Sequence, residues 1–272
     1  MSSQVQPEKI GVKELRKMVA EKRAIVAVTA YDALMARMAD EAGVDLILVG
    51  DSLGMTMLGY KTTIPVTMRD ILHHTSAVVR GVTRAMVVAD MPFMTYHTSQ
   101  EDAMRNAAVF LQEGGADAVK LEGGQAVSQT VERLVVAGVP VLGHIGILPQ
   151  SVLSEGGYHV QGRTPEGALK LLADARAIQD AGAFGIVLEG LPGTLSVEIS
   201  EELEIPTIGI GAGPGCDGQI QVLHDILGLF EDFVPKHTKR YAELATDIRQ
   251  AVAHYRSDVC DGVFPGEEQT FK

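Results

Sequence analysis

The sequence predicts a single (β/α)8 TIM barrel with an extra N-terminal helix, and the first reason is a repeated unit. Residues 42–51, 115–123, 137–144 and 181–190 can be superposed on one another. Each has a glycine at its first or second position, where a helix should end, and continues as a short apolar run. Glycine adopts the left-handed conformation that closes a helix, and an unbroken apolar run suits a parallel strand buried on both faces.

Further strands and intervening helices complete the prediction. Strands of the same kind are expected at residues 24–29, 86–90 and 206–211, with a weaker eighth strand near residues 230–236. Apolar residues between the strands keep helical spacing, and one helix has Thr164 as its expected N-cap and Pro165 at its first position. Seven or eight strand–helix units in about 250 residues fit a barrel.

These elements give the expected domain organisation. All 272 residues are predicted to form one domain. The barrel is placed at about residues 24–255, and a leading helix at about residues 12–22 could close its floor. A C-terminal tail is expected at about residues 257–272.

An open, doubly wound sheet is the alternative architecture. Such a sheet would carry a nucleotide site where its strand order reverses. No G-x-G-x-x-G pattern follows the first expected strand, and the glycine-rich residues 209–213 come late in the chain. A tight turn explains that segment better than a phosphate-binding loop, so the barrel is preferred.

Composition excludes several classes of partner. The net charge of −12 argues against nucleic acid and against docking on anionic lipid. The start of the chain is polar and lacks a signal peptide's apolar region, and the longest apolar runs are far too short to span a membrane. Cys216 and Cys260 form no disulfide-framework pattern. A cytoplasmic protein with no nucleic-acid or membrane partner is expected.

Polar residues gather at the expected strand ends, where the catalytic groups of a barrel lie. Any one acid there could be a helix cap or a solvated loop carboxylate. Several carboxylates in one cleft would repel one another unless a cation neutralised them. The residues at these positions are Asp51, Asp90, Lys120, Glu122, His144 and Glu189.

The donor types indicate which cation to expect. Oxygen donors with little Cys or His support favour a hard metal, Mg²⁺ ahead of Mn²⁺ or Zn²⁺. Asp51 and Asp90 are the primary candidates as ligands, and Glu122 is a third that could act through water. Lys120 lies two residues before Glu122 and faces the same side of the strand. It could bind a substrate carboxylate or form a structural ion pair, and spacing alone leaves both open.

Glu189 and His144 are the candidates for proton transfer. If Glu189 is not a ligand, it is available to remove a proton from carbon, and a metal chelated by a 2-oxo acid would make that proton acidic. His144 could bind substrate or orient a neighbour, and the structural role is the simpler one. Tyr31 and Asp32, just after the first strand, are expected to pack in a loop.

Seven motifs in sequence order carry a family resemblance. They are residues 29–32, 49–55, 88–93, 119–123, 143–150, 156–163 and 211–219. Together they resemble the ketopantoate hydroxymethyltransferase family over roughly residues 10–264. The resemblance implies a barrel enzyme that transfers a hydroxymethyl unit from 5,10-methylenetetrahydrofolate to 3-methyl-2-oxobutanoate, giving 2-dehydropantoate for pantothenate and coenzyme A synthesis. It also implies Mg²⁺, a cytoplasmic location and a homo-oligomer, commonly a decamer.

The resemblance also assigns roles by position. Asp51 and Asp90 correspond to metal ligands that also contact substrate, and Glu122 corresponds to a third ligand. Ser52 and Lys120 correspond to substrate contacts, and Glu189 corresponds to the proton acceptor. His144 remains a possible auxiliary residue.

Three other readings of the same residues compete with this one. The first is a magnesium-dependent lyase of the phosphoenolpyruvate mutase and isocitrate lyase kind, although the cysteine loop typical of those lyases is not evident. The second is a Schiff-base aldolase that uses Lys120. The third is a non-enzymatic binding or assembly protein, which the matched acids disfavour.

Overall fold

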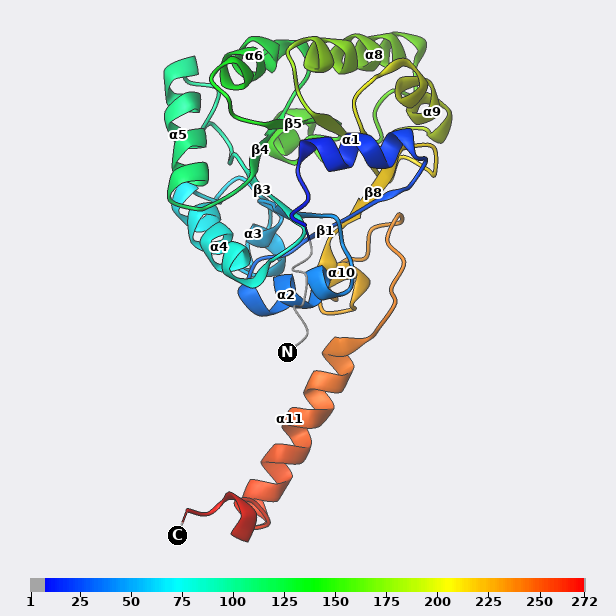
Figure 1. Cartoon of the computed structure of the whole chain (residues 1–272). Coiled ribbons are helices and arrows are strands. Elements are labelled where there is room, and N and C mark those ends of the chain that lie inside the picture. Colours follow the sequence, from blue (N-terminus) through cyan, green and yellow to red (C-terminus); the bar gives the residue numbers. More distant parts are fainter. Residues whose placement is uncertain (1–7, 272) are drawn as a thin grey trace. The chain divides into compact units, whose positions relative to one another are not determined.

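The computed structural model describes residues 8–271 and divides into two compact units, Met1–Val222 and Leu223–Lys272. In the first unit, eight parallel strands pair in sequence order and close into a barrel, with β8 beside β1 (Figure 1). The strands are β1 (Ile25–Thr29), β2 (Leu46–Val49), β3 (Met86–Asp90), β4 (Ala118–Glu122), β5 (Val141–Gly146), β6 (Gly185–Glu189), β7 (Thr207–Ile210) and β8 (Gly218–Gln221). The predicted fold class is confirmed.

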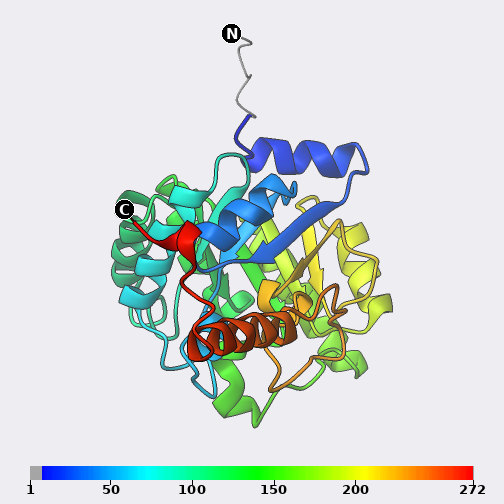
Figure 2. The same ribbon diagram turned by 90° about the horizontal axis from the view of Figure 1, so that it is seen from below.

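Helices surround these strands (Figures 1 and 2). They begin and end largely where local signals place them: the Thr164 side chain caps α8 by accepting a hydrogen bond from Gly167 N at 3.1 Å, and Gly43 after α2 has φ +89°. The helices of this unit are α1 (Val12–Ala20), α2 (Ala33–Glu41), α3 (Leu53–Thr56), α4 (Met68–Gly81), α5 (Gln100–Gln112), η1 (Gln125–Val127), α6 (Ser128–Val136), η2 (Pro149–Ser151), α7 (Val152–Glu155), α8 (Pro165–Asp180) and α9 (Gly193–Glu202).

The leading helix α1 packs against the barrel core. Leu15 and Met18 of α1 are fully buried in one cluster with residues of all eight strands, among them Ile25, Leu46 and Met86. These last three lie at or near the amino ends of their strands. Helix α1 therefore closes the barrel floor, as expected, and leaves the carboxyl ends for the site.

The eighth strand was predicted in the wrong place. It lies at Gly218–Gln221, whereas residues 230–236 form no strand, and Phe233 and Val234 there are exposed. The cause is the composition of the two segments. Strand β8 has only four residues, two of them Gln, and its apolar signal is therefore weak. Its backbone is specified by pairing with β1 and β7, which is a property of the closed barrel.

The second unit contains α10 (Leu223–Ile226), α11 (Leu244–Cys260) and η3 (Glu267–Gln269). Helix α11 buries none of its residues within the described chain. The expectation of a single domain with a barrel reaching about residue 255 and a tail from about residue 257 stays a prediction. Within residues 8–271, no helix has the length and apolar character needed to cross a membrane.

Candidate active site

Three acids converge at the carboxyl ends of β2, β3 and β4. Asp90 ends β3 and Glu122 ends β4, while Asp51 follows β2 by two residues. Each offers a carboxylate oxygen within 4.8 Å of those of the other two, and all three side chains are buried. The barrel topology explains the convergence, because the carboxyl ends of adjacent parallel strands meet at one rim.

Lys120 lies inside this acidic cluster. Its Nζ donates to the two oxygens of Asp90 at 2.8 and 2.9 Å and to Glu122 Oε1 at 3.2 Å. Burial disfavours the ammonium, but the neighbouring carboxylates, Asp90 foremost, outweigh burial and raise the pKa of Lys120 well above its usual value. The structural ion pair that spacing left open is therefore present, and Lys120 is charged.

The cluster holds three acidic side chains and one basic side chain. Burial, then the charges of Asp90 and Glu122, raise the pKa of Asp51 well above its usual value. Burial likewise raises the pKa of Glu122 to about 7, although Lys120 opposes the shift. Three carboxylates beside one ammonium would be relieved by a divalent cation, and a set of buried oxygen donors suits a hard one. The residues present thus fit a metal site.

His144 lies between the acidic cluster and Glu189. Its Nε2 is 3.2 Å from Glu189 Oε2 and its Nδ1 is 3.7 Å from Glu122 Oε1. Burial, followed by the charge of Lys120, holds the pKa of His144 well below its usual value, so the imidazole is neutral. Gly146 lets β5 approach the end of β6, because a Cβ there would lie 2.1 Å from Glu189 O.

Glu189 is more accessible than the three acids of the cluster. Its side chain is 19 % exposed, against 2 % for Glu122 and 1 % for Asp90. It ends β6 after the apolar run Ile186, Val187 and Leu188, all buried. A partly open carboxylate beside a buried charged cluster is placed to meet a substrate that occupies the barrel mouth.

Ser52 is oriented from the first strand. The Tyr31 hydroxyl lies 2.8 Å from Ser52 Oγ and accepts a hydrogen bond from Thr29 Oγ1 at 2.8 Å. Tyr31 is fully buried, as expected of a residue that packs in the loop, and Asp32 caps α2 by accepting from the N–H groups of Leu34 and Met35. Tyr31 therefore contacts Ser52, a candidate substrate-binding residue. The sequence did not indicate this contact.

Two further buried residues at the cluster were not singled out by sequence. Gln150 and Tyr96 are 4 % and 2 % exposed, and they hydrogen-bond to each other and to Glu122. Gln150 is the last residue of the motif at residues 143–150, and this motif is the one sequence feature that could have marked it as a site residue. Tyr96 lies in a loop with no comparable mark.

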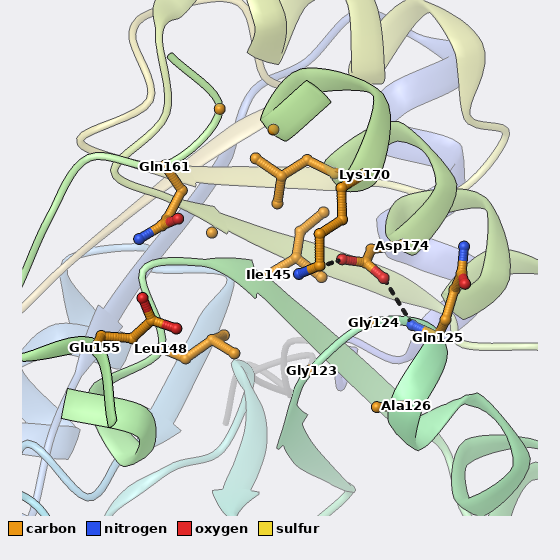
Figure 3. A pocket seen from close by; sticks show the side chains of 14 residues that line it. Gly123, Gly124, Gln125, Ala126, Ile145, Leu148, Glu155, Gln161, Lys170 and Asp174 are labelled. Atoms are coloured by element: carbon orange, nitrogen blue, oxygen red, sulfur yellow. Dashed lines mark hydrogen bonds and ion pairs between the residues drawn. The ribbon is translucent and has the colours of Figure 1, made fainter. Parts of the chain in front are cut away.

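A separate pocket of about 600 Å³ lies beside the carboxyl ends of β4 and β5 and against α8 (Figure 3). Asp174 in its wall accepts a hydrogen bond from Gln125 N at 2.9 Å and lies 3.5 Å from Lys170 Nζ. None of the sequence-predicted site residues lines this pocket. The carboxylate of Asp174 is paired with Lys170 and Gln125 of the same wall, so the charges of this pocket do not indicate a ligand.

Fold and site together define a (β/α)8-barrel protein with a candidate divalent-metal site at the carboxyl ends of its strands. Residues 9–267 match the family model described as ketopantoate hydroxymethyltransferase. The chain therefore belongs to that family, which makes it an enzyme of the hydroxymethyltransferase class and confirms the resemblance.

Relatives and solved structures agree with this assignment. A 3-methyl-2-oxobutanoate hydroxymethyltransferase of Syntrophus aciditrophicus is 52 % identical over all of both chains. Another from Chloroflexus aurantiacus is 56 % identical over 96 % of this chain and 92 % of its own. A phosphoenolpyruvate phosphomutase from Streptomyces platensis subsp. rosaceus shares the fold at TM-score 0.63 and 16 % identity, covering 93 % of this chain and 88 % of its own.

A phosphonopyruvate hydrolase solved with oxalate and Mg²⁺ is similar at TM-score 0.64 and 14 % identity, covering 95 % of this chain and 92 % of that one. At such identities the likeness extends to the fold alone. The lyase alternative therefore gains a shared architecture but no support at the level of the reaction.

Proposed function

We propose that this enzyme transfers a hydroxymethyl unit from 5,10-methylenetetrahydrofolate to 3-methyl-2-oxobutanoate, with Mg²⁺ at the acidic cluster. The product would be 2-dehydropantoate, for pantothenate and coenzyme A synthesis. Within the family assignment, the observation that carries the proposal is the buried set Asp51, Asp90 and Glu122 beside the more open carboxylate of Glu189. Such a site combines metal ligands with a separate base, which is what proton removal next to a 2-oxo acid requires.

Asp51 and Asp90 would hold the cation, with Glu122 as a third ligand, directly or through water. A Mg²⁺ ion held by these residues would supply Lewis-acid polarisation of the 2-oxo group, which would acidify the proton on the neighbouring carbon. Ser52 and Lys120 would bind the substrate carboxylate. Tyr31 supports that role because its hydroxyl lies 2.8 Å from Ser52 Oγ and limits the orientations of that side chain.

Glu189 would accept the proton from the branched carbon. The neutral imidazole of His144, with its Nε2 3.2 Å from Glu189 Oε2, packs beside the carboxylate without cancelling its charge. The enolate left by proton removal would form the new carbon–carbon bond with the one-carbon unit of the folate. The bond from that carbon to the folate nitrogen would break and release tetrahydrofolate, and water would supply the hydroxyl group of the product. His144 is thus an auxiliary positioning residue in this scheme, consistent with the simpler role expected for it.

A Schiff base on Lys120 is disfavoured by the surroundings of that residue. An amine must lose its proton to attack a carbonyl, whereas the Lys120 ammonium is bound by Asp90 and Glu122 and has a raised pKa. Borohydride added with substrate would inactivate an enzyme that forms an imine. It would leave a metal-dependent enzyme, which forms no imine, uninhibited.

We also propose that the enzyme self-associates in the cytoplasm, as a decamer by family resemblance. Helix α11 supports self-association because Ile248, Val252, Tyr255 and Val259 follow helical spacing and are each about half exposed within the described chain.

The test of the proposed function is deuterium exchange into 3-methyl-2-oxobutanoate in D₂O with folate absent. We expect the protein to exchange the proton on the branched carbon when Mg²⁺ is present. The exchange should stop when a chelator removes the Mg²⁺. Adding methylenetetrahydrofolate should then give 2-dehydropantoate. Exchange that persists unchanged in chelator, or no exchange under any condition, would refute the proposal.

A further inference from the structure

Gln150 is a buried amide with hydrogen bonds into the acidic cluster. It lies in η2, directly after β5, with Pro149 at the first position of that turn, and it is 4 % exposed. Its backbone N–H donates to Glu122 Oε2 at 3.0 Å, and its side-chain Nε2 donates to Asp51 Oδ2 at 3.0 Å. One residue therefore contacts two of the three candidate metal ligands.

The surrounding groups allow one orientation of this amide. Nε2 faces two acceptors, Asp51 Oδ2 and Met91 O, each at 3.0 Å. Oε1 accepts a hydrogen bond from the Tyr96 hydroxyl at 2.9 Å. The reversed amide would place its oxygen against a carboxylate and a carbonyl, so the hydrogen-bond chemistry fixes the rotamer.

Tyr96 links the Gln150 amide to the backbone of Glu122 at the end of β4. Its hydroxyl accepts a hydrogen bond from Glu122 N at 3.2 Å while lying 2.9 Å from Gln150 Oε1. The backbone of Glu122 and the amide of Gln150 are thus held by the same hydroxyl. Because every one of these groups is buried, any loss leaves a polar atom without water to replace its partner.

We propose that Gln150 is a positioning residue of the metal site, holding the Asp51 and Glu122 carboxylates at the spacing that a divalent cation requires. The inference rests on the proposed function, because it takes the cluster to bind a cation. Gln150 does not itself act as a ligand: its N–H groups point at the acids, and Oε1 is engaged by Tyr96. It acts through the acids, as outer partners that orient metal ligands do.

Gln150→Met is the substitution that isolates this role. Methionine keeps the length and unbranched shape of the side chain and the backbone N–H to Glu122, but it removes the amide. Mn²⁺ is titrated into the metal-free protein without substrate, and the EPR signal of free Mn²⁺ measures how much is bound. The affinity for Mn²⁺ should weaken by about 10- to 100-fold. Circular dichroism and thermal melting should still report a folded protein.

Two companion variants sharpen the experiment. Tyr96→Phe removes only the hydroxyl that holds Oε1, and it should weaken Mn²⁺ binding in the same direction by a smaller factor. If Gln150→Met fails to fold, Tyr96→Phe carries the test. Gln125→Met makes the same chemical change on an exposed side chain and should bind Mn²⁺ like the parent.

The Mg²⁺ dependence of exchange separates positioning from general damage. For Gln150→Met the Mg²⁺ concentration giving half-maximal exchange should rise, while the rate at saturating Mg²⁺ returns towards that of the parent. A parent that binds Mn²⁺ and variants that bind it equally well would overturn the positioning role and leave the proposed function standing. A parent that neither binds Mn²⁺ nor exchanges deuterium would overturn both.

Discussion

Glu189→Gln tests the proton-transfer role most directly. Glutamine has nearly the same shape as glutamate and can still hydrogen-bond at the end of β6, but it lacks the negative charge that accepts a proton. The position is 19 % exposed and 3.2 Å from His144 Nε2, so the change introduces no large void and keeps one polar neighbour. We expect substrate and Mg²⁺ still to bind, and enolisation to fall.

The structure indicates how large the fall should be. Loss of a general base costs about 10²- to 10⁴-fold in rate, or about 3–5 kcal/mol of barrier. His144 is the nearest substitute base, but burial and the charge of Lys120 hold its pKa well below the usual value, and a weaker base removes a carbon-bound proton more slowly. We therefore expect a loss in the upper half of that range.

NMR-detected deuterium exchange into 3-methyl-2-oxobutanoate, with folate absent, isolates this step from carbon–carbon bond formation. Glu198→Gln on α9 makes the same change at an exposed position and should exchange at the parental rate. If Glu189→Gln exchanged as fast as the parent, Glu189 would not be the base, and His144 would be the next group to examine.

Further expectations follow for the metal site, for the buried carboxylate of Asp40 on α2 and for the second unit. Asp90→Ala should lose metal-dependent activity while circular dichroism reports an intact fold, and full activity of this variant after chelator treatment would contradict the ligand assignment. Asp40→Asn should lower the free energy of unfolding by about 2–4 kcal/mol in urea titrations, because the buried carboxylate accepts hydrogen bonds from the backbone N–H groups of residues 83–85. Burial raises the pKa of Asp40, but those hydrogen bonds outweigh it and lower the pKa, so the contribution is present above about pH 4 and lost as the pH falls further. The stability gap between parent and variant should therefore close in acid, and a gap independent of pH would argue against this charge effect. Sedimentation at micromolar concentration should report an assembly that Val252→Asp on α11 weakens, whereas a monodisperse parental monomer would count against self-association.

Much of the barrel could be predicted because its signals are local. Glycines such as Gly43 and Gly115 have positive φ where helices end, and Thr164 caps α8 as its sequence indicates. The strands at residues 86–90 and 118–122 lie where their apolar runs predicted them. Once a barrel is accepted, acids at successive strand ends must share one rim, so the meeting of Asp51, Asp90 and Glu122 followed from topology.

What the sequence could not determine depends on contacts between distant segments. Strand β8 has a weak apolar pattern and is specified by its pairing with β1 and β7. Gln150 donates to Asp51 across 99 residues of chain and accepts from Tyr96 across 54. The pKa directions of Glu122 and His144 arise from burial together with their charged neighbours.

Sequence by itself thus determined the class of fold, the family and the acids available for chemistry. The closed barrel decided which of those acids are buried together, which amide and hydroxyls orient them, and which histidine stays neutral. The physical reason is that the ends of helices and strands respond to neighbours a few residues away. Desolvation and hydrogen bonding at the site depend instead on loops that meet only after all eight strands have closed.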